Sequence, residues 1–127
     1  MPELQWHAQT VPHFDYLLRD LRPACVLAGG HCVPVNLPAP ECLIWQKLYA
    51  SASRQRDLAK AEKDLLQAAT LIAILVEGDD FHLAGSRAEV PGDVLKAAQT
   101  RGPALRRLLN AHPQALDEVE QAPAGAA

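Results

Sequence analysis

Basic side chains recur at helical spacing in two neighbouring segments of this 127-residue chain. Residues at i, i+4 and i+7 share one face of a helix. Two such series occur here: Lys47, Ser51 and Arg54, then Arg56, Lys60, Lys63 and Gln67. If the two segments form a helical hairpin, these faces border one groove, which would suit a triphosphate or a phosphodiester backbone. The alternative is a solvated basic face that Glu62 and Asp64 balance.

The composition indicates a single domain with an aliphatic core. Apolar residues form 49% of the chain and aromatic residues only 5%, so Leu, Ile, Val and Ala must fill the interior. The formal net charge of -3 gives no overall attraction to nucleic acid, so we expect no nucleic-acid partner.

Three cysteines, Cys25, Cys32 and Cys42, form no C-x-x-C pair. An odd number of cysteines without metal-ligand spacing predicts buried, free thiols in a reducing compartment. The longest apolar run, residues 68–76, is too short to span a membrane, and no signal peptide is recognisable. We therefore expect a soluble, cytoplasmic protein with no membrane partner.

The apolar pattern predicts an α+β fold, mainly α, in which a short β-hairpin precedes a helical bundle. Apolar residues at helical spacing predict a short helix at residues 13–21, and Pro23 is expected to end this helix. Two short apolar runs flank Gly29-Gly30, which predicts a two-residue turn with Val26 opposite Val33. Pro34 has no backbone N–H to donate to a neighbouring strand, so the second strand should be an edge strand or end soon.

Helices are predicted from Pro38 onward. The longest, at residues 57–77, carries the apolar stripe Leu58, Leu65 and Ile72, and Gly78 is its expected stop. Shorter helices follow, the last ending near residue 112. We expect a single domain over residues 1–120. It would comprise a short helix and hairpin at 13–37 and a helical bundle at 38–112, with a flexible tail at 121–127.

One stretch of the chain resembles a known family. Its motifs, in order, are Pro38-Ala39-Pro40-Glu41, Trp45-Gln46-Lys47-Leu48, Arg54 and Lys60-Ala61-Glu62-Lys63-Asp64-Leu65-Leu66-Gln67-Ala68. This order is similar to the P-x-P-E, H-K-L, R and K-x-x-K-D-x-x-Q-A region of bacterial nucleotidyltransferase-fold proteins. A looser version occurs in the nucleotidyltransferase toxins of abortive-infection systems. The hairpin resembles the last strands of that fold's sheet, and the similarity covers roughly residues 11–109.

The resemblance implies that Lys47, Lys63 and Asp64 line a nucleotide site, with Arg54 as their companion. Lys60 joins them on the same helical face by its spacing. Lysine suits phosphate because its ammonium group is a compact point charge. Asp64 would orient a basic side chain or approach a metal. Its structural alternative is an ion pair with Lys60 on the helix surface.

The chain also departs from that family. Its members carry Asp-x-Asp or Asp-x-Glu after a Gly-Gly or Gly-Ser turn, and these carboxylates bind the catalytic metal ions. Here Gly29-Gly30 is followed by no acid, no such motif occurs elsewhere, and Gln46 replaces the family's histidine. These departures imply a truncated or degenerate relative that binds nucleotide or phosphate without catalysing alone. Mg²⁺ would enter only in an assembly with a catalytic partner chain.

A function of a different class fits the same helices. They could form a small protein-interaction module, antitoxin-like or scaffold-like, with no nucleotide binding. The basic face would then bind protein or solvent. In either case an exposed edge strand at the hairpin would favour a homodimer.

Three further hypotheses have less support in the sequence. His31 and the cysteines lack the spacing of a standard zinc site, and Asp79-Asp80 beside His82 fits a helix cap better than a metal site. Residues 92–110 resemble a helix-turn-helix, which the net negative charge disfavours. The phosphate contacts of such a motif would be Arg101, Arg106 and Arg107.

Overall fold

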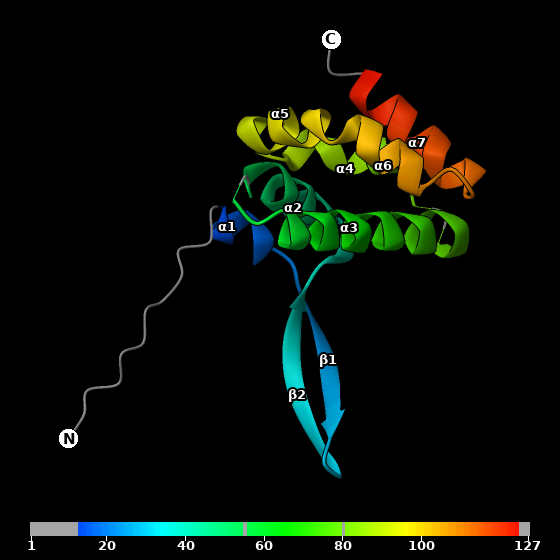
Figure 1. Ribbon diagram of the computed structural model, residues 1–127. Helices are drawn as coiled ribbons and strands as arrows, with labels where there is room; N and C mark the ends of the chain where they lie inside the picture. Colours follow the sequence, from blue (N-terminus) through cyan, green and yellow to red (C-terminus); the bar gives the residue numbers. More distant parts are fainter. Residues whose placement is uncertain (1–12, 55, 80, 125–127) are drawn as a thin grey trace, which may run out of the picture.

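A computed structural model describes residues 13–54, 56–79 and 81–124 of the chain. The fold is α+β and mainly helical, and one antiparallel β-hairpin precedes the helical bundle, so the predicted fold class is confirmed. Figure 1 shows the hairpin extending away from the packed helices. Within these ranges no helix combines the length and the apolar composition that a membrane crossing requires.

The hairpin and the helices follow one another in a simple order. The elements are α1 (Phe14–Leu17), β1 (Leu21–Ala28), β2 (His31–Pro38), α2 (Pro40–Ser53), α3 (Leu58–Asp79), α4 (Leu83–Ser86), the 3-10 helix η1 (Arg87–Glu89), α5 (Gly92–Thr100), α6 (Gly102–Leu108) and α7 (Pro113–Ala124). Helix α2 packs against α3 and α5, while α7 packs against α3 and α4. The two longest helices, α2 and α3, therefore form the centre of the bundle.

The two strands are joined by the predicted two-residue turn. Gly29 and Gly30 have φ values of 56° and 77°, which glycine adopts without steric strain. Two positive φ values are typical of the turn whose twist matches that of paired strands. Val26 pairs with Val33, so the predicted register is confirmed.

Prolines lie inside both strands without ending either. Pro34 lies in an edge strand, as predicted, but Pro23 does not end a helix over residues 13–21 as the sequence suggested. Both strands are eight residues long, α1 ends at Leu17, and Pro23 lies within β1. After a two-residue turn, alternate residue pairs exchange no hydrogen bonds, and Pro23, Pro34 and Pro38 all belong to such pairs. Their nitrogens face away from the partner strand, so the ladder loses no hydrogen bond.

The prediction of three free thiols is wrong. Cys25 and Cys32 form a disulfide that joins the two strands, with their Cα atoms 6.1 Å apart. They lie diagonally on one face of the hairpin, because Cys25 is opposite Pro34 and Cys32 is opposite Leu27. Only Cys42 is a free cysteine, and it is buried as predicted.

The predicted apolar stripe of α3 lies in the core, with one exception. Leu65 and Ile72 are buried, but Leu58 is 70% exposed because it is the first residue of the helix, beside an exposed connecting loop. The stripe packs against buried side chains of the neighbouring helices. These are Ile44 and Leu48 of α2, Val94 of α5, Leu105 of α6 and Val119 of α7.

Two helix ends also differ from the prediction. Gly78 does not stop α3, which continues to Asp79. A further helix, α7, begins at Pro113 and continues to Ala124, where the sequence predicted no helix beyond residue 112 and a flexible tail from residue 121. Ala115 and Val119 of α7 are buried, so this short helix completes the core.

We expect thiol titration to distinguish the disulfide from the predicted free cysteines. Unfolding without reductant should expose one thiol, that of Cys42, and unfolding with reductant should expose three. In the native protein, Cys42 should react slowly with a thiol reagent. Burial raises the pKa of its thiol, so less thiolate is present at neutral pH, and the reaction should accelerate as the pH rises. Three reactive thiols without reductant would contradict the disulfide.

Candidate functional site

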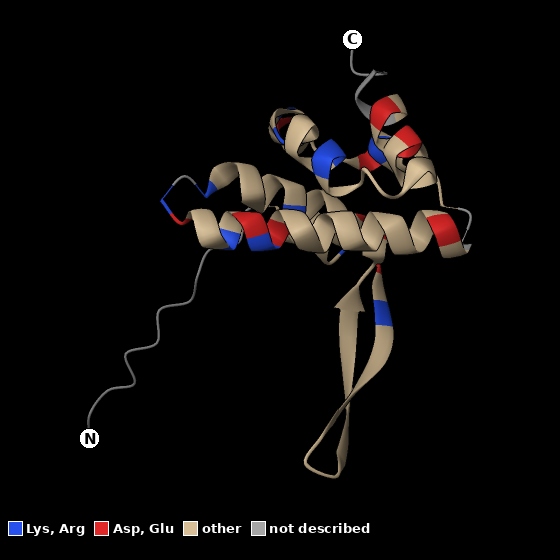
Figure 2. Ribbon diagram, turned by 45° about the vertical axis from the view of Figure 1, so that its right-hand side comes forward, with Lys and Arg blue, Asp and Glu red and all other residues tan. Residues whose placement is uncertain are grey.

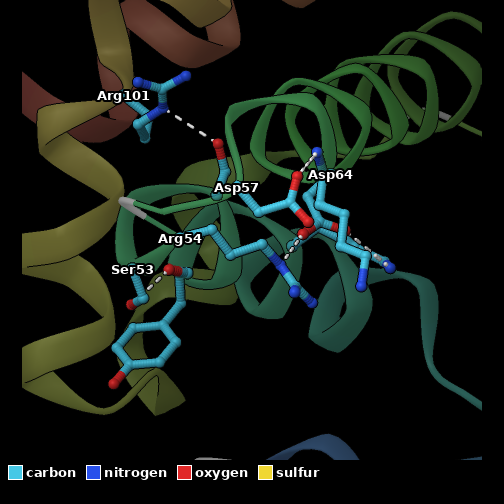
Figure 3. Close-up of polar contacts among 9 residues, drawn as sticks. Ser53, Arg54, Asp57, Asp64 and Arg101 are labelled. Atoms are coloured by element: carbon cyan, nitrogen blue, oxygen red, sulfur yellow. Dashed lines mark hydrogen bonds and ion pairs between the residues drawn. The ribbon is translucent and has the colours of Figure 1, made fainter.

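A buried carboxylate joins the two central helices. Asp64 on α3 is only 6% exposed. Its two oxygens accept hydrogen bonds from two cations, one on α2 and one on the residue directly after α2. Lys47 Nζ lies 3.2 Å from Oδ1, and Arg54 Nε lies 2.7 Å from Oδ2 (Figure 3). The structure thus brings together three of the five predicted site residues. We call Lys47, Arg54 and Asp64 the Asp64 cluster.

Asp64 is not the surface acid that the ion-pair alternative assumed. It is a buried acid whose partners are Lys47 and Arg54 rather than Lys60. A buried carboxylate is tolerated only when it is paired and hydrogen-bonded. Because both of its oxygens already bind cations, Asp64 positions basic side chains and is poorly placed to ligate a metal.

Both cations of the cluster keep part of their surface in solvent. The side chain of Lys47 is 30% exposed and that of Arg54 is 43% exposed. Arg54 uses only its Nε atom for Asp64, so its two terminal amino groups face away from the carboxylate (Figure 3). Two parallel N–H donors of this kind match the oxygens of a phosphate.

Lys60 and Lys63 do not join the Asp64 cluster. Both side chains are exposed on α3, and no described residue forms a hydrogen bond or ion pair with either ammonium group. Lys60 lies one turn before Asp64, and its backbone N–H donates to Asp57 Oδ1 at 3.1 Å, which caps the helix start. The first turns of α3 therefore present two free ammonium groups beside the cluster.

The charge around the cluster is positive although the chain is negative. Figure 2 shows basic and acidic residues gathered on the first turns of α3 and the neighbouring connection. Five basic residues lie here (Lys47, Arg54, Arg56, Lys60 and Lys63), and three acids (Asp57, Glu62 and Asp64). Five positive and three negative charges leave a local balance of +2, against -3 for the whole chain.

Ser51 belongs to the predicted basic face but is not available to a ligand there. Its side chain is buried, and its Oγ accepts a hydrogen bond from Arg101 Nε at 3.1 Å (Figure 3). This contact links α2 to the junction between α5 and α6. It also engages one of the arginines that a helix-turn-helix would have used for DNA.

The described residues offer no metal centre. They contain no group of three or more His, Cys, Asp or Glu side chains arranged to hold an ion. Cys25 and Cys32 are joined in a disulfide and are therefore not available as zinc ligands. His82 Nδ1 lies 2.8 Å from Glu118 Oε1. Gln46 is buried, and its Oε1 has no partner among the residues described.

Comparison with known families identifies the chain. Residues 1–91 of the 127 match the model of a nucleotidyltransferase family, which covers both strands and the whole Asp64 cluster. The match extends over more than half of the chain, so the protein belongs to this nucleotidyltransferase family. No curated protein and no solved structure matches it.

Replacing Asp64 with asparagine should destabilise the fold. The amide keeps the shape of the side chain but presents an NH₂ donor to one of the two cations, leaving that pairing unmade. We expect the free energy of unfolding to fall by about 1–3 kcal/mol, measured by urea denaturation. Glu62→Gln is the matched control, because it makes the same change on an exposed side chain of the same helix and should shift stability by less than about 0.5 kcal/mol. Equal stability of the two variants would show that the Asp64 cluster contributes nothing.

Proposed function

We propose that this member of the nucleotidyltransferase family binds the phosphate groups of a nucleotide at Lys47, Arg54, Lys60 and Lys63. In this proposal the chain is an accessory domain and not a complete enzyme. One observation carries it: buried Asp64 binds two cations at once and leaves their outer donors in solvent.

The Asp64 cluster would prepare its cations for an anion. Ordering a long basic side chain costs conformational entropy, and contact with Asp64 has already ordered Lys47 and Arg54. One carboxylate balances only one of the two positive charges, so the cluster retains a charge of +1. Its remaining donors are the terminal amino groups of Arg54 and the free N–H bonds of Lys47 Nζ, which suit phosphate oxygens.

Lys60 and Lys63 would extend this site along α3. Both ammonium groups are exposed, and a nucleotide triphosphate carries several charges, more than the cluster alone can balance. An exposed lysine adds attraction that salt screens over about 8–10 Å. Binding should therefore weaken as the ionic strength rises.

The accessory role follows from the missing carboxylates. The sequence holds no Asp-x-Asp or Asp-x-Glu, and the described residues provide no metal centre. The residues present therefore do not fit the Mg²⁺ ions that nucleotidyl transfer requires. If the protein takes part in that reaction, a partner chain must supply the metal-binding carboxylates.

Nucleotide titration tests the binding site. We expect the wild-type protein to bind ATP by calorimetry, and the Lys60→Ala/Lys63→Ala double variant to bind it at least about tenfold more weakly, since each charge-assisted hydrogen bond contributes about 1.5–3 kcal/mol. Lys96→Ala is the matched control, because Lys96 is an exposed lysine on α5, outside the site, and its loss should leave affinity unchanged. Absence of binding by the wild-type protein would favour a protein-interaction module, and equal weakening by the control would show non-specific attraction.

A turnover assay tests the accessory role separately. The isolated chain with Mg²⁺ and each of the four nucleoside triphosphates should release no pyrophosphate and label no acceptor. A complete nucleotidyltransferase in the same assay is the positive control. Turnover that persists after repurification would overturn the accessory role without affecting the binding site.

A further inference from the structure

The hairpin carries almost no charge: Arg22, at the base of β1, is the one acidic or basic residue on its two strands. The protein has 12 basic and 15 acidic residues, and none of these 27 lies between Pro23 and Pro38. Figure 2 shows the strands without acidic or basic residues except near the base of β1, where Arg22 lies. Natural sheet edges are commonly protected by charged side chains, and beyond Arg22 this hairpin has none on either strand.

One face of the hairpin is aliphatic and uncovered. The register places Ala24 and Val26 of β1 on the same face as their partners in β2, Val35 and Val33. Leu37 and its partner Arg22 lie on this face at the base of the hairpin. Val26, Val33 and Leu37 are each about half exposed, at 48%, 51% and 50%. A two-stranded sheet with an uncovered apolar face is marginal in water, and additional strands stabilise it.

The two outer edges of the hairpin are not equivalent. On β2, Pro34 and Pro38 occupy outward-facing positions and have no N–H, so this edge offers donors only at Cys32 and Asn36. On β1 the backbone N–H groups of Leu21, Cys25 and Leu27 face outward, and Pro23 is the one outward position of this strand without a donor. No described residue pairs with the outer edge of β1. The β1 edge is therefore the one able to accept another strand.

We propose that β1 pairs in antiparallel fashion with β1 of a second copy of this chain, forming a four-stranded sheet across a two-fold axis. This inference is independent of nucleotide binding. The two copies offer the same open edge. The charged residue of β1, Arg22, lies near the start of the strand, so antiparallel pairing keeps the two copies of Arg22 at opposite ends and avoids like-charge repulsion. The aliphatic faces of both hairpins would then lie on the same side of one sheet.

The position of the hairpin leaves room for the second copy. It extends away from the helices (Figure 1), so antiparallel pairing puts the two helical bundles at opposite ends of the sheet. Eight residues of strand span about 27 Å, which separates the bundles by more than the screening length of about 8 Å at physiological salt. The net charge of -3 on each chain therefore opposes this dimer only weakly.

Sedimentation of two proline variants tests the proposal. Leu27→Pro removes an outward N–H from the open edge, at a side chain that is 79% exposed, and should halve the mass of the wild-type dimer to that of a monomer. Asn36→Pro makes the same change on the edge that already carries outward prolines and should leave the dimer intact. An unchanged free-thiol count and circular dichroism spectrum show that each hairpin remains folded. A wild-type protein that is monomeric at every concentration, or variants that behave alike, would overturn the proposal.

Hydrogen exchange on the wild-type protein provides a test that needs no variant. The amides of Cys25 and Leu27 should become protected as protein concentration increases, because each gains an acceptor across the two-fold axis. The amides of Cys32 and Asn36 on the other edge should exchange at the same rate throughout. Protection of the β2 edge, or of neither edge, would overturn pairing through β1.

Discussion

The contact between α2 and α3 depends on one buried charge. A carboxylate removed from water costs several kcal/mol unless it is paired and hydrogen-bonded, and Asp64 meets that condition through Lys47 and Arg54. Together with the apolar core, this cost favours the packing of the two helices in which both cations reach Asp64. The same packing places the positive charge of the two cations at the surface. The structural role of Asp64 and the proposed role of its partners thus have the same cause.

The hairpin is stabilised by different interactions. At its base the Ala39 N–H donates to the Asp20 carbonyl at 2.9 Å, and Arg22 Nη2 lies 3.7 Å from Glu41 Oε1 of α2. Beyond its base, the hairpin contributes no residue to the buried core of the helices. Its shape comes from two glycines with positive φ, outward-facing prolines and the Cys25–Cys32 disulfide. A cross-link of this kind stabilises the hairpin chiefly by restricting the unfolded chain. It does not cover the aliphatic face, which is why an interface is expected there rather than in the well-packed helices.

The sequence predicted the features that depend on local patterns. The Gly29-Gly30 turn, the strand register and the burial of Ile72 follow from turn chemistry and periodicity, and all are confirmed. The disulfide was missed because an odd number of cysteines does not reveal which pairs lie close together, although the predicted register had already put Cys25 and Cys32 on one face. Helix α7 was missed because its apolar stripe is too short to be distinctive until the rest of the core is assembled.

The burial of Asp64 had a signal in the sequence that spacing alone did not resolve. Asp64 lies three residues after Ala61 and four before Ala68, both in the core, so it borders the apolar stripe and not the solvent face. A charge at such a position needs partners from another helix, and the basic series containing Lys47 and Arg54 was the nearest candidate.

The pairing of Asp64 with these two cations also couples folding to ligand binding. An anion that binds these two cations favours the folded state over the unfolded chain, since only the folded chain holds both cations against Asp64. The Asp64 cluster therefore belongs both to the packing of the helices and to the proposed phosphate site, where the ligand would balance the positive charge that Asp64 does not neutralise.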